Sequence, residues 1–161
     1  MGLQRKDKKM CYTYKNGLRE GVVFAFINNN KILVEHRYVN NKEEVFFTSG
    51  SIEDKDYNKQ RDYKVECLFR EVKEEFQAKI NINNYVYLNE VIAKPINIIF
   101  YVFLITDWAG EMPSYTYENN QQDCLVTWEY LSDYKNIFEY DTAYTICERI
   151  KNYITKGERD E

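Results

Sequence analysis

The first part of the chain alternates between short apolar runs and turn residues. The runs at residues 21–27 and 31–37 are rich in β-branched and aromatic residues, and three asparagines, 28 to 30, separate them. Such runs favour strands and such asparagines favour a turn, so the pattern predicts a β-hairpin. A short strand is predicted at residues 44–48, just before the sequence SGSIE.

Residues 64–76 follow a helical period instead. Apolar residues recur there at spacings of three and four and form one stripe, made of Val65, Leu68, Phe69, Val72 and Phe76. This spacing is typical of an amphipathic helix that packs one face on a core. The helix is predicted to end at residues 76–78.

The second part of the chain predicts strands at 85–93, 96–106 and 124–131, and a closing amphipathic helix at 138–154. The strand at 96–106 is apolar enough to be central in a sheet. Residues 107–123 contain glycine, proline and many polar residues, so a long surface loop is predicted there. Strands and helices are mixed without regular alternation, which indicates an α/β (α+β) sandwich with a mixed sheet flanked by helices.

The bulk composition narrows the class of protein. A length of 161 residues with 44% hydrophobic content predicts one domain, with a core at about 21–154 and peripheral segments at 1–20 and 155–161. The net charge of -4 argues against general nucleic-acid binding, which needs a surplus of clustered cations. No run approaches the roughly 18 apolar residues of a membrane span, so a soluble, cytoplasmic protein is predicted.

The cysteines offer no metal signature. They are widely spaced at positions 11, 67, 124 and 147, and the chain has a single histidine, His36. We expect buried structural thiols and a histidine on the surface of the sheet.

Three glutamates share one face of the predicted helix. Glu71, Glu74 and Glu75 fall within an arc of roughly 100°, directed away from the apolar stripe. We therefore expect the three side chains to converge on one solvent-accessible cleft. Like charges at these spacings cost about 0.2 to 0.5 kcal/mol per pair, and a hard divalent cation with oxygen ligands would reverse that effect. The alternative interpretation is a solvated, charged helix face.

The surrounding residues resemble the Nudix box. That pattern is Gly, five residues, Glu, seven residues, then Arg-Glu-aliphatic-any-Glu-Glu-any-Gly-aliphatic, and the sequence FREVKEEF matches its second half from Arg70 to Glu75. Upstream, FFTSGSIE resembles the motif that opens the box, with Gly50 as the second glycine. The order of predicted elements also agrees, so the resemblance covers residues 22–154 and implies a Nudix-like fold.

The sequence departs from the pattern at several positions. Nineteen residues separate Gly50 from Arg70 where the pattern has thirteen, so about six extra residues lie in the polar segment EDKDYNKQRDYK, residues 53–64. Counting back from Arg70 places the first acid of the box at Asp62. The extra segment is predicted to be a mobile surface element at the rim of the cleft, outside the core. Gln77 replaces the closing glycine, so the helix end is expected to adopt another geometry.

The resemblance implies hydrolysis of a nucleoside diphosphate linked to another moiety, with Mg²⁺ or Mn²⁺. Glu71 and Glu75 are the implied metal ligands, and Glu74 is either a further ligand or the group that orients water. Gly50 would let its carbonyl approach the metal. Arg70 would position a carboxylate through charge-assisted hydrogen bonds.

Further roles are implied outside the box. A late acid, Asp123 or Glu118, is a candidate general base, with Asp123 favoured because it precedes the strand that contains Trp128. Arg37 is a candidate contact for a substrate phosphate. An aromatic residue, Phe46, Phe47 or Tyr38, is a candidate for stacking on a base, although core packing accounts for such aromatics more often.

Several alternatives stay open. A Nudix-like nucleotide-binding module would keep the fold without turnover. An isopentenyl-diphosphate-isomerase-like enzyme would use a cysteine and a glutamate, but Cys67 lies within the box helix and Cys11 precedes the domain. The substrate could be an oxidised nucleoside triphosphate, a nucleotide sugar, ADP-ribose or a dinucleoside polyphosphate. The predicted partner is a small nucleoside diphosphate derivative, without membrane or general nucleic-acid binding, and a homodimer is also open.

Overall fold

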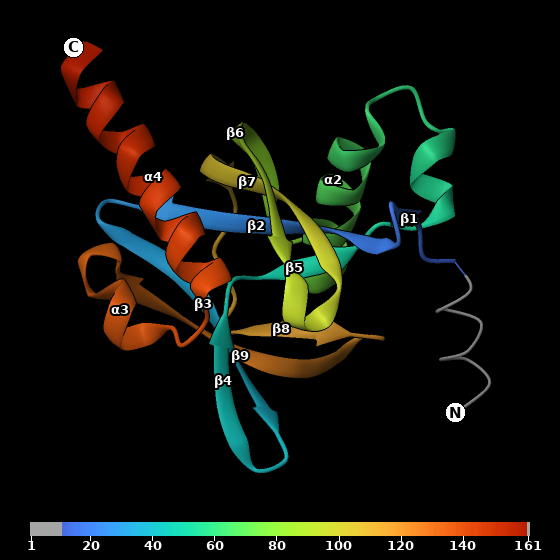
Figure 1. Cartoon of the computed structure of the whole chain (residues 1–161), viewed down its shortest axis with the longest axis horizontal. Coiled ribbons are helices and arrows are strands. Elements are labelled where there is room, and N and C mark those ends of the chain that lie inside the picture. Colours follow the sequence, from blue (N-terminus) through green and yellow to red (C-terminus); the bar gives the residue numbers. More distant parts are fainter. Residues whose placement is uncertain (1–10, 161) are drawn as a thin grey trace.

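The computed structural model describes residues 11–160, which form a curled, mixed β-sheet with helices on both faces (Figure 1). The strands are β1 (Tyr14–Lys15), β2 (Leu18–Asn28), β3 (Lys31–Val39), β4 (Lys42–Phe46), β5 (Ser49–Ser51), β6 (Asn81–Ala93), β7 (Ile98–Ala109), β8 (Tyr115–Glu118) and β9 (Gln121–Tyr130). The α-helices are α2 (Tyr63–Glu75), α3 (Tyr134–Ile137) and α4 (Asp141–Asp160), and the 3-10 helices are η1 (Asp54–Asn58), η2 (Lys94–Ile96) and η3 (Leu131–Asp133).

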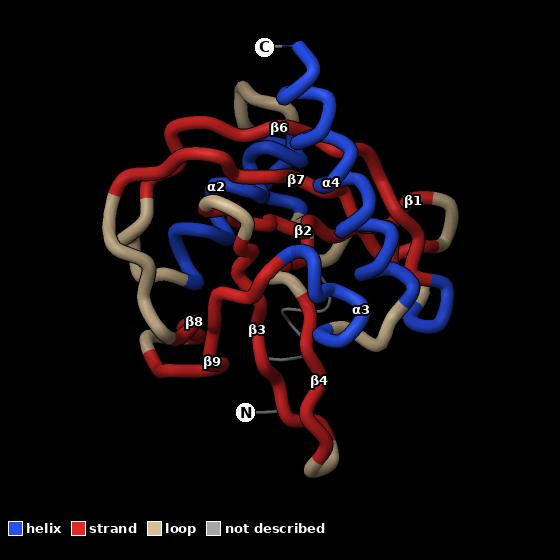
Figure 2. The backbone as a smooth tube through the Cα atoms, turned by 90° about the vertical axis from the view of Figure 1, so that its left-hand side faces the viewer, coloured by secondary structure: helices blue, strands red, loops and turns tan. Residues whose placement is uncertain are grey.

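The sheet bends at β2 because this strand is shared between two halves. The strand order is β6-β7-β2-β3-β9-β8, with β1 and β5 also paired to β2 and β4 paired to β3. β2 runs parallel to β7 over residues 19–26, but it pairs with β3 only through its last two residues, 27 and 28. Figure 2 shows β6, β7 and β2 above β3 and β4, so the two halves of the sheet lie at different levels.

The two faces of the sheet have separate cores, as expected for a strand buried on both sides. Val22, Phe24 and Phe26 of β2 belong to the cluster that contains the buried residues of α2. Val23 and Ala25 belong to the other cluster, which contains those of α4. The alternation along β2 therefore seats one helix on each face. The predicted sandwich of a mixed sheet flanked by helices is confirmed.

Asparagine pairs form the tight turns of the sheet. Asn40 and Asn41 join β3 to β4 with φ of 53° and 64°, and Asn119 and Asn120 join β8 to β9 with φ of 52° and 63°. Two-residue hairpin turns of this kind need positive φ at both positions, which asparagine tolerates better than most residues. The long loop predicted at 107–123 is therefore wrong, because β7 continues to Ala109 and the rest contains the hairpin of β8 and β9.

Other boundaries differ from the prediction by a few residues. β2 starts at Leu18, and Glu20 is only 1% exposed, so the core begins before residue 21. Residues 1–10 of the segment predicted to be peripheral lie outside the described residues. The closing helix α4 begins later than predicted, at Asp141, and extends to Asp160. Among residues 11–160, no helix has the length and apolar character needed to cross a membrane.

Strand β4 lies at an edge of the sheet. Among the described strands it pairs only with β3, over residues 35–39 and 42–46. Its first three residues, Lys42, Glu43 and Glu44, are charged, and the hairpin that it forms with β3 projects from the body of the molecule (Figure 1).

The end of α2 keeps a left-handed geometry without glycine. Gln77 has φ of 52° and Ala78 has φ of 60°, and the Ala78 amide donates to the Lys73 carbonyl at 2.8 Å. The expectation of another geometry at this helix end is therefore wrong. Gln77 and Ala78 adopt the left-handed conformation, although it costs free energy for residues that have a Cβ.

We expect Ala78→Gly to stabilise the protein. Ala78 is exposed, and positive φ costs a residue with a Cβ about 1 to 2 kcal/mol, which glycine avoids at the expense of a more flexible unfolded chain. The net gain should be about 0.5 to 1 kcal/mol, measured by urea denaturation. Ala78→Ser keeps the Cβ and serves as the control that should show no gain. An equal gain in both variants would contradict this explanation.

Candidate active site

Asp62 immediately precedes helix α2 and caps its first turn. The Asp62 side chain accepts a hydrogen bond from the Lys64 amide at 2.8 Å and lies 3.1 Å from Lys64 Nζ. Such a cap satisfies one of the amides that the first turn of a helix leaves without a partner. The placement of the first acid of the box at Asp62 is wrong, because this side chain makes its contacts at the start of the helix and not with Arg70.

Asp56 takes that position instead. Its carboxylate accepts from Arg70 Nε and Nη2, both at 2.9 Å, and its side chain is only 3% exposed. Asp56 also follows Gly50 after five residues, which is the spacing of the box counted forward. The extra residues therefore lie between Asp56 and Arg70, and the prediction that the whole segment 53–64 lies outside the core is wrong at Asp56.

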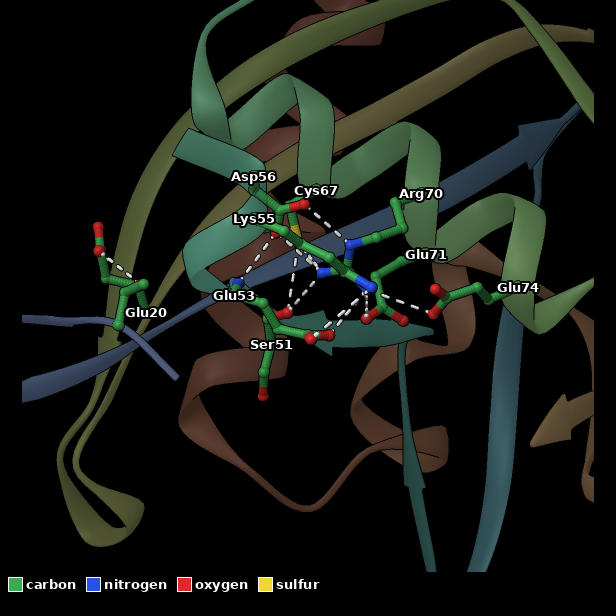
Figure 3. A network of polar contacts seen from close by, with 10 residues as sticks. Glu20, Ser51, Glu53, Lys55, Asp56, Cys67, Arg70, Glu71 and Glu74 are labelled. Atoms are coloured by element: carbon green, nitrogen blue, oxygen red, sulfur yellow. Dashed lines mark hydrogen bonds and ion pairs between the residues drawn. The ribbon is translucent and has the colours of Figure 1, made fainter. Parts of the chain in front are cut away.

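Arg70 collects further carboxylates on its other nitrogen. Nη1 lies 3.0 Å from Glu53 Oε2, 3.0 Å from Glu71 Oε1 and 3.3 Å from Glu74 Oε2 (Figure 3). With Asp56, four carboxylates surround one guanidinium, so the cluster keeps a surplus of negative charge. The predicted contact between Arg70 and a carboxylate of the box is present. Protein carboxylates therefore occupy the guanidinium fork of Arg70.

Glu71 lies directly over the backbone of Gly50. A Cβ added to Gly50 would come within 2.2 Å of Glu71 Cδ, so only glycine leaves room for this carboxylate. The Glu71 side chain is 12% exposed. Burial raises its pKa to about 7, although Arg70 opposes the shift, while Glu74 and Glu53 add to it.

Glu75 lies near Glu35 of β3 and Asp123 of β9, whose charges act on its carboxyl group. Its Oε2 is buried and has no hydrogen-bond partner among the described residues. Burial raises the pKa of Glu75 well above its ordinary value, and the nearby carboxylates of Glu35, Glu71 and Asp123 raise it further. Burying a carboxylate oxygen that has no hydrogen-bond partner costs free energy. The presence of such an oxygen at Glu75 therefore indicates that a positively charged ligand binds it.

Glu35 was not predicted from the sequence as a site residue. It lies on β3, is 5% exposed, and accepts hydrogen bonds from Arg37 Nε at 3.2 Å and Nη2 at 2.7 Å. Burial raises the pKa of Glu35, Arg37 lowers it and Asp123 raises it. The sequence feature that could have identified Glu35 is an acidic residue directly after the apolar run Ile32–Val34.

The three glutamates of α2 do not converge on one point. Among residues 11–160, no group of three or more acidic, histidine or cysteine side chains is arranged to hold a metal ion. Glu74 is 52% exposed and turns toward Arg70, whereas Glu75 turns into the molecule. Glu74 and Glu75 lie about 100° apart around the helix axis, so their side chains point in different directions and meet different surroundings. The prediction of convergence is therefore wrong for Glu74.

The donor set nevertheless fits a divalent cation. The acids outnumber the single guanidinium, the oxygen of Glu75 has no partner, and Gly50 leaves space for Glu71. Hard oxygen donors with surplus negative charge are what Mg²⁺ and Mn²⁺ prefer. Glu71 and Glu75 are the residues that meet this description.

The other candidate residues occupy different places. Asp123 is exposed on β9 and close enough to Glu75 and Glu35 to raise the pKa of both. Glu118 ends β8 at the tip of the hairpin, beside Asn119. The structure therefore brings Asp123 to the carboxylates of the site and places Glu118 at the hairpin turn.

The residues of β3 divide between its two faces. The Arg37 side chain is 56% exposed on the same face as Glu35. His36 and Tyr38 lie on the opposite face, where His36 bonds to Glu43 and Thr127 and Tyr38 bonds to Glu43. The predicted position of His36 on the sheet surface is confirmed, and Tyr38 is not on the face of the acidic site.

Two aromatic candidates pack in the core. The Phe46 ring lies 5.7 Å from that of Phe100 and 5.9 Å from that of Phe47, and Phe47 stacks on Phe138 at 4.9 Å. These rings are engaged in packing on the α4 side of the sheet. We therefore do not include Phe46 or Phe47 in the proposed substrate site.

A further buried carboxylate, Glu20, anchors the segment that carries Asp56. Four hydroxyls bond to it, from Thr13 at 2.9 Å and from Tyr57, Tyr63 and Tyr101 at 2.6 Å each. Burial alone would raise the pKa of Glu20, but these hydrogen bonds outweigh it and the pKa is lowered. Tyr57 adjoins Asp56 in η1 and stacks on Tyr63 at 4.0 Å, so η1 is held on one side by Glu20 and on the other by Arg70.

We expect Gly50→Ala to displace Glu71 while the fold persists. The new Cβ would overlap the Glu71 carboxyl group, which is the end of a flexible side chain and can move. A displacement of about 1 Å can lower turnover by roughly a hundredfold. The measurements are the melting temperature and, with Mg²⁺ present, the hydrolysis of a nucleoside diphosphate derivative, which is the reaction that the sequence resemblance implies. Gly157→Ala, where an added Cβ meets nothing within 4 Å, is the control that should keep full activity.

We expect the stability of the metal-free protein to fall as the pH rises from about 5 to about 7.5. The folded-state pKa of Glu71 is raised to about 7 from 4.5, so its contribution is full below pH 4.5 and is lost as the pH rises through 7. The loss from Glu71 is at most about 3 kcal/mol. Added Mg²⁺ should reverse it, so the gain in melting temperature from Mg²⁺ should be larger at pH 8 than at pH 6. In Glu71→Gln the metal-free slope should flatten, and an unchanged slope would contradict the assignment.

The fold matches known structures although the sequence does not. No protein-family model matches this chain, and no curated protein matches it. The crystal structure of an ADP compounds hydrolase superposes with a TM-score of 0.66 at 15% identity, covering 91% of this chain and 84% of that chain. A MutT NUDIX hydrolase from Burkholderia pseudomallei gives a TM-score of 0.61 at 18% identity, covering 82% and 97%.

A third match has a different description. The C-terminal domain of mouse MUTYH, in a complex with human PCNA, gives a TM-score of 0.55 at 10% identity, covering 84% of this chain and 89% of that chain. The chain therefore has the Nudix fold, and the resemblance found in its sequence is confirmed at the level of the fold. The fold is shared by structures with different descriptions, so the activity has to be argued from the site.

Proposed function

We propose that this protein is a Mg²⁺- or Mn²⁺-dependent hydrolase that cleaves the pyrophosphate linkage of a nucleoside diphosphate joined to another moiety. The observation that supports it most is the unpartnered, buried oxygen of Glu75 beside Glu71, on the helix that carries the box in a Nudix fold. A solvated, charged helix face would have no such oxygen.

Each residue has a role in the proposal. A bound divalent cation supplies a water of lowered pKa and neutralises charge on the phosphoryl oxygens. Glu71 and Glu75 would hold the cation, the Gly50 carbonyl is proposed as a further ligand, and Arg70 keeps Glu71 in place through its 3.0 Å contact. Glu74 is exposed at the edge of the site, where orienting water suits it better than ligation.

Two residues outside α2 complete the proposed site. Asp123 is the favoured general base, because its charge acts on Glu75 and it is open to solvent on β9. Glu118, at the hairpin turn, is the second choice. Arg37 keeps more than half of its side chain exposed while it bonds to Glu35, so it can contact a substrate phosphate.

The isomerase alternative is disfavoured by the state of Cys67. This thiol is fully buried, donates to the Ser51 carbonyl at 3.6 Å, and burial raises its pKa well above the ordinary value. A group in this environment is poorly suited to exchange protons with a substrate. The other described alternative, a binding module without turnover, is decided by experiment.

The decisive experiment is a substrate panel with the purified protein. Nucleotide sugars, ADP-ribose, oxidised nucleoside triphosphates and dinucleoside polyphosphates are incubated with Mg²⁺, with Mn²⁺ and with a chelator, and released nucleoside monophosphate is measured. Metal-dependent release of that product from at least one compound is expected. Nucleotide binding without product would favour the binding module, and double-bond migration in isopentenyl diphosphate would favour the isomerase. The homodimer and the cytoplasmic location stay predictions.

A further inference from the structure

A recess lies beside α2 and the segment that precedes it. Its volume is about 700 Å³, which is in the range of small-molecule sites. Its walls come from the segment that contains η1, from the outer face of α2 and from Asn120 at the tip of the β8–β9 hairpin. The segment that the sequence adds to the box pattern therefore builds one side of this recess.

The recess is cationic in a protein with a net charge of -4. Five cations line it, Lys55, Lys59, Arg61, Arg70 and Lys73, against three acids, Asp56, Glu66 and Glu74. Each acid already has a guanidinium partner: Asp56 and Glu74 bond to Arg70, and Glu66 bonds to Arg61 at 2.7 Å. The surplus charge therefore rests on the three lysines.

The lysines are available to a ligand. Lys59 and Lys73 are exposed, and Lys55 Nζ lies 3.9 Å from Glu53, at the outer limit of an ion pair. Exposed ammonium groups on flexible stems are well suited to phosphate oxygens, because each offers three donors. The guanidinium of Arg61 lies over the Phe69 ring at 4.3 Å, and this cation–π contact holds the two side chains against each other on one side of the recess.

The recess adjoins the proposed site through two shared residues. Arg70 and Glu74 line it, and Arg70 Nη1 is 3.0 Å from Glu71. Figure 3 shows Lys55 beside Arg70, with Glu71 and Glu74 on the adjoining side. A linear phosphate chain with one pyrophosphate at Glu71 could therefore extend past Glu74 toward the lysines.

We propose that this recess binds phosphate groups that the substrate carries beyond the scissile pyrophosphate. The inference rests on the proposed function and refines it: the favoured substrates are nucleotides with long phosphate chains, and nucleotide sugars are poorer. The side chains that line the recess are five cations and three acids, so an anion is favoured there over a metal cation. Binding there lowers KM for long chains without taking part in the bond cleavage.

Direct binding is tested with inorganic tripolyphosphate and metal-free protein, by isothermal titration calorimetry. The wild-type protein should bind, and the double variant Lys59→Gln/Lys73→Gln should bind at least tenfold more weakly. The control Lys94→Gln/Lys156→Gln removes the same charge from exposed positions outside the recess and should bind as the wild type does. No binding by the wild type, equal affinity in the first variant, or an equal loss in the control would each overturn the proposal.

Kinetics separate this inference from the proposed function. With a dinucleoside tetraphosphate, Lys59→Gln/Lys73→Gln should raise KM at least tenfold with kcat unchanged, and with a nucleotide sugar both constants should stay as in the wild type. An equal rise in KM for both substrates would overturn the subsite. If tripolyphosphate binds as described but no substrate is hydrolysed, the hydrolase proposal fails and the anion site stands. If short substrates are hydrolysed and tripolyphosphate does not bind, the anion site fails and the hydrolase proposal stands.

Discussion

Glu75→Gln is expected to abolish most metal-dependent hydrolysis while the protein stays folded. The amide has nearly the shape of the carboxylate, but it lacks the charge that a divalent cation needs, and the cation supplies both the nucleophile and the charge stabilisation. A loss of turnover of at least a hundredfold is expected. The stability of the metal-free protein should be unchanged or higher, because the buried Glu75 stands near the carboxylates of Glu35, Glu71 and Asp123.

The measurement pairs hydrolysis of an accepted substrate with thermal denaturation, both with and without Mg²⁺. Glu158→Gln, on the exposed side of α4, is the matched control and should behave as the wild type does. If Glu75→Gln keeps both wild-type turnover and the wild-type rise in melting temperature with Mg²⁺, Glu75 is not a metal ligand and the proposed chemistry of α2 is wrong.

Glu20→Gln is expected to cause the largest loss of stability. Glu20 is 1% exposed and its two oxygens accept four hydroxyl bonds, three of them from tyrosines at 2.6 Å. An amide has only one acceptor oxygen, and its NH₂ group would face hydroxyls that are oriented as donors. The loss should be about 2 to 4 kcal/mol, or roughly 4 to 16 °C in melting temperature.

The pH dependence of stability distinguishes the loss of the Glu20 hydrogen bonds from a purely steric effect of the substitution. The pKa of Glu20 is lowered, so its contribution is full above pH 4.5 and is lost as the pH falls through the folded-state value. The difference between wild type and Glu20→Gln should therefore shrink below about pH 4. Tyr57→Phe removes one of the four bonds and should cost about 1 to 2 kcal/mol. A change in melting temperature of less than one degree in Glu20→Gln would refute this account.

The sequence predicts those parts of the fold where local patterns and tertiary packing agree. The stripe of α2 is an example, because Leu68 and Val72 are buried as their spacing indicates. The hairpin of β8 and β9 is the opposite case. Gly110 and Pro113 indicate a loop, and the turn depends on positive φ at Asn119 and Asn120, where the commoner signal is Asn-Gly.

The acids of the site show where counting along a sequence reaches its limit. Asp56 and Asp62 both fit an acidic position of the box, one counted from Gly50 and the other from Arg70. The two acids are distinguished by their contacts, because Asp56 accepts hydrogen bonds from Nε and Nη2 of Arg70. Asp56 and Arg70 are fourteen residues apart, so this contact depends on how the intervening segment folds. Glu20 is similar, since its partners come from four separate segments.

The edge strand β4 bears on how this protein behaves at high concentration. A strand with an open edge presents unpaired amides and carbonyls, to which a strand of another molecule can add. Lys42, Glu43 and Glu44 place three consecutive charges along this edge, and these side chains would lose hydration if a strand of another copy added there. The projecting hairpin is thus protected against the fibre-forming contacts that a long apolar strand would invite.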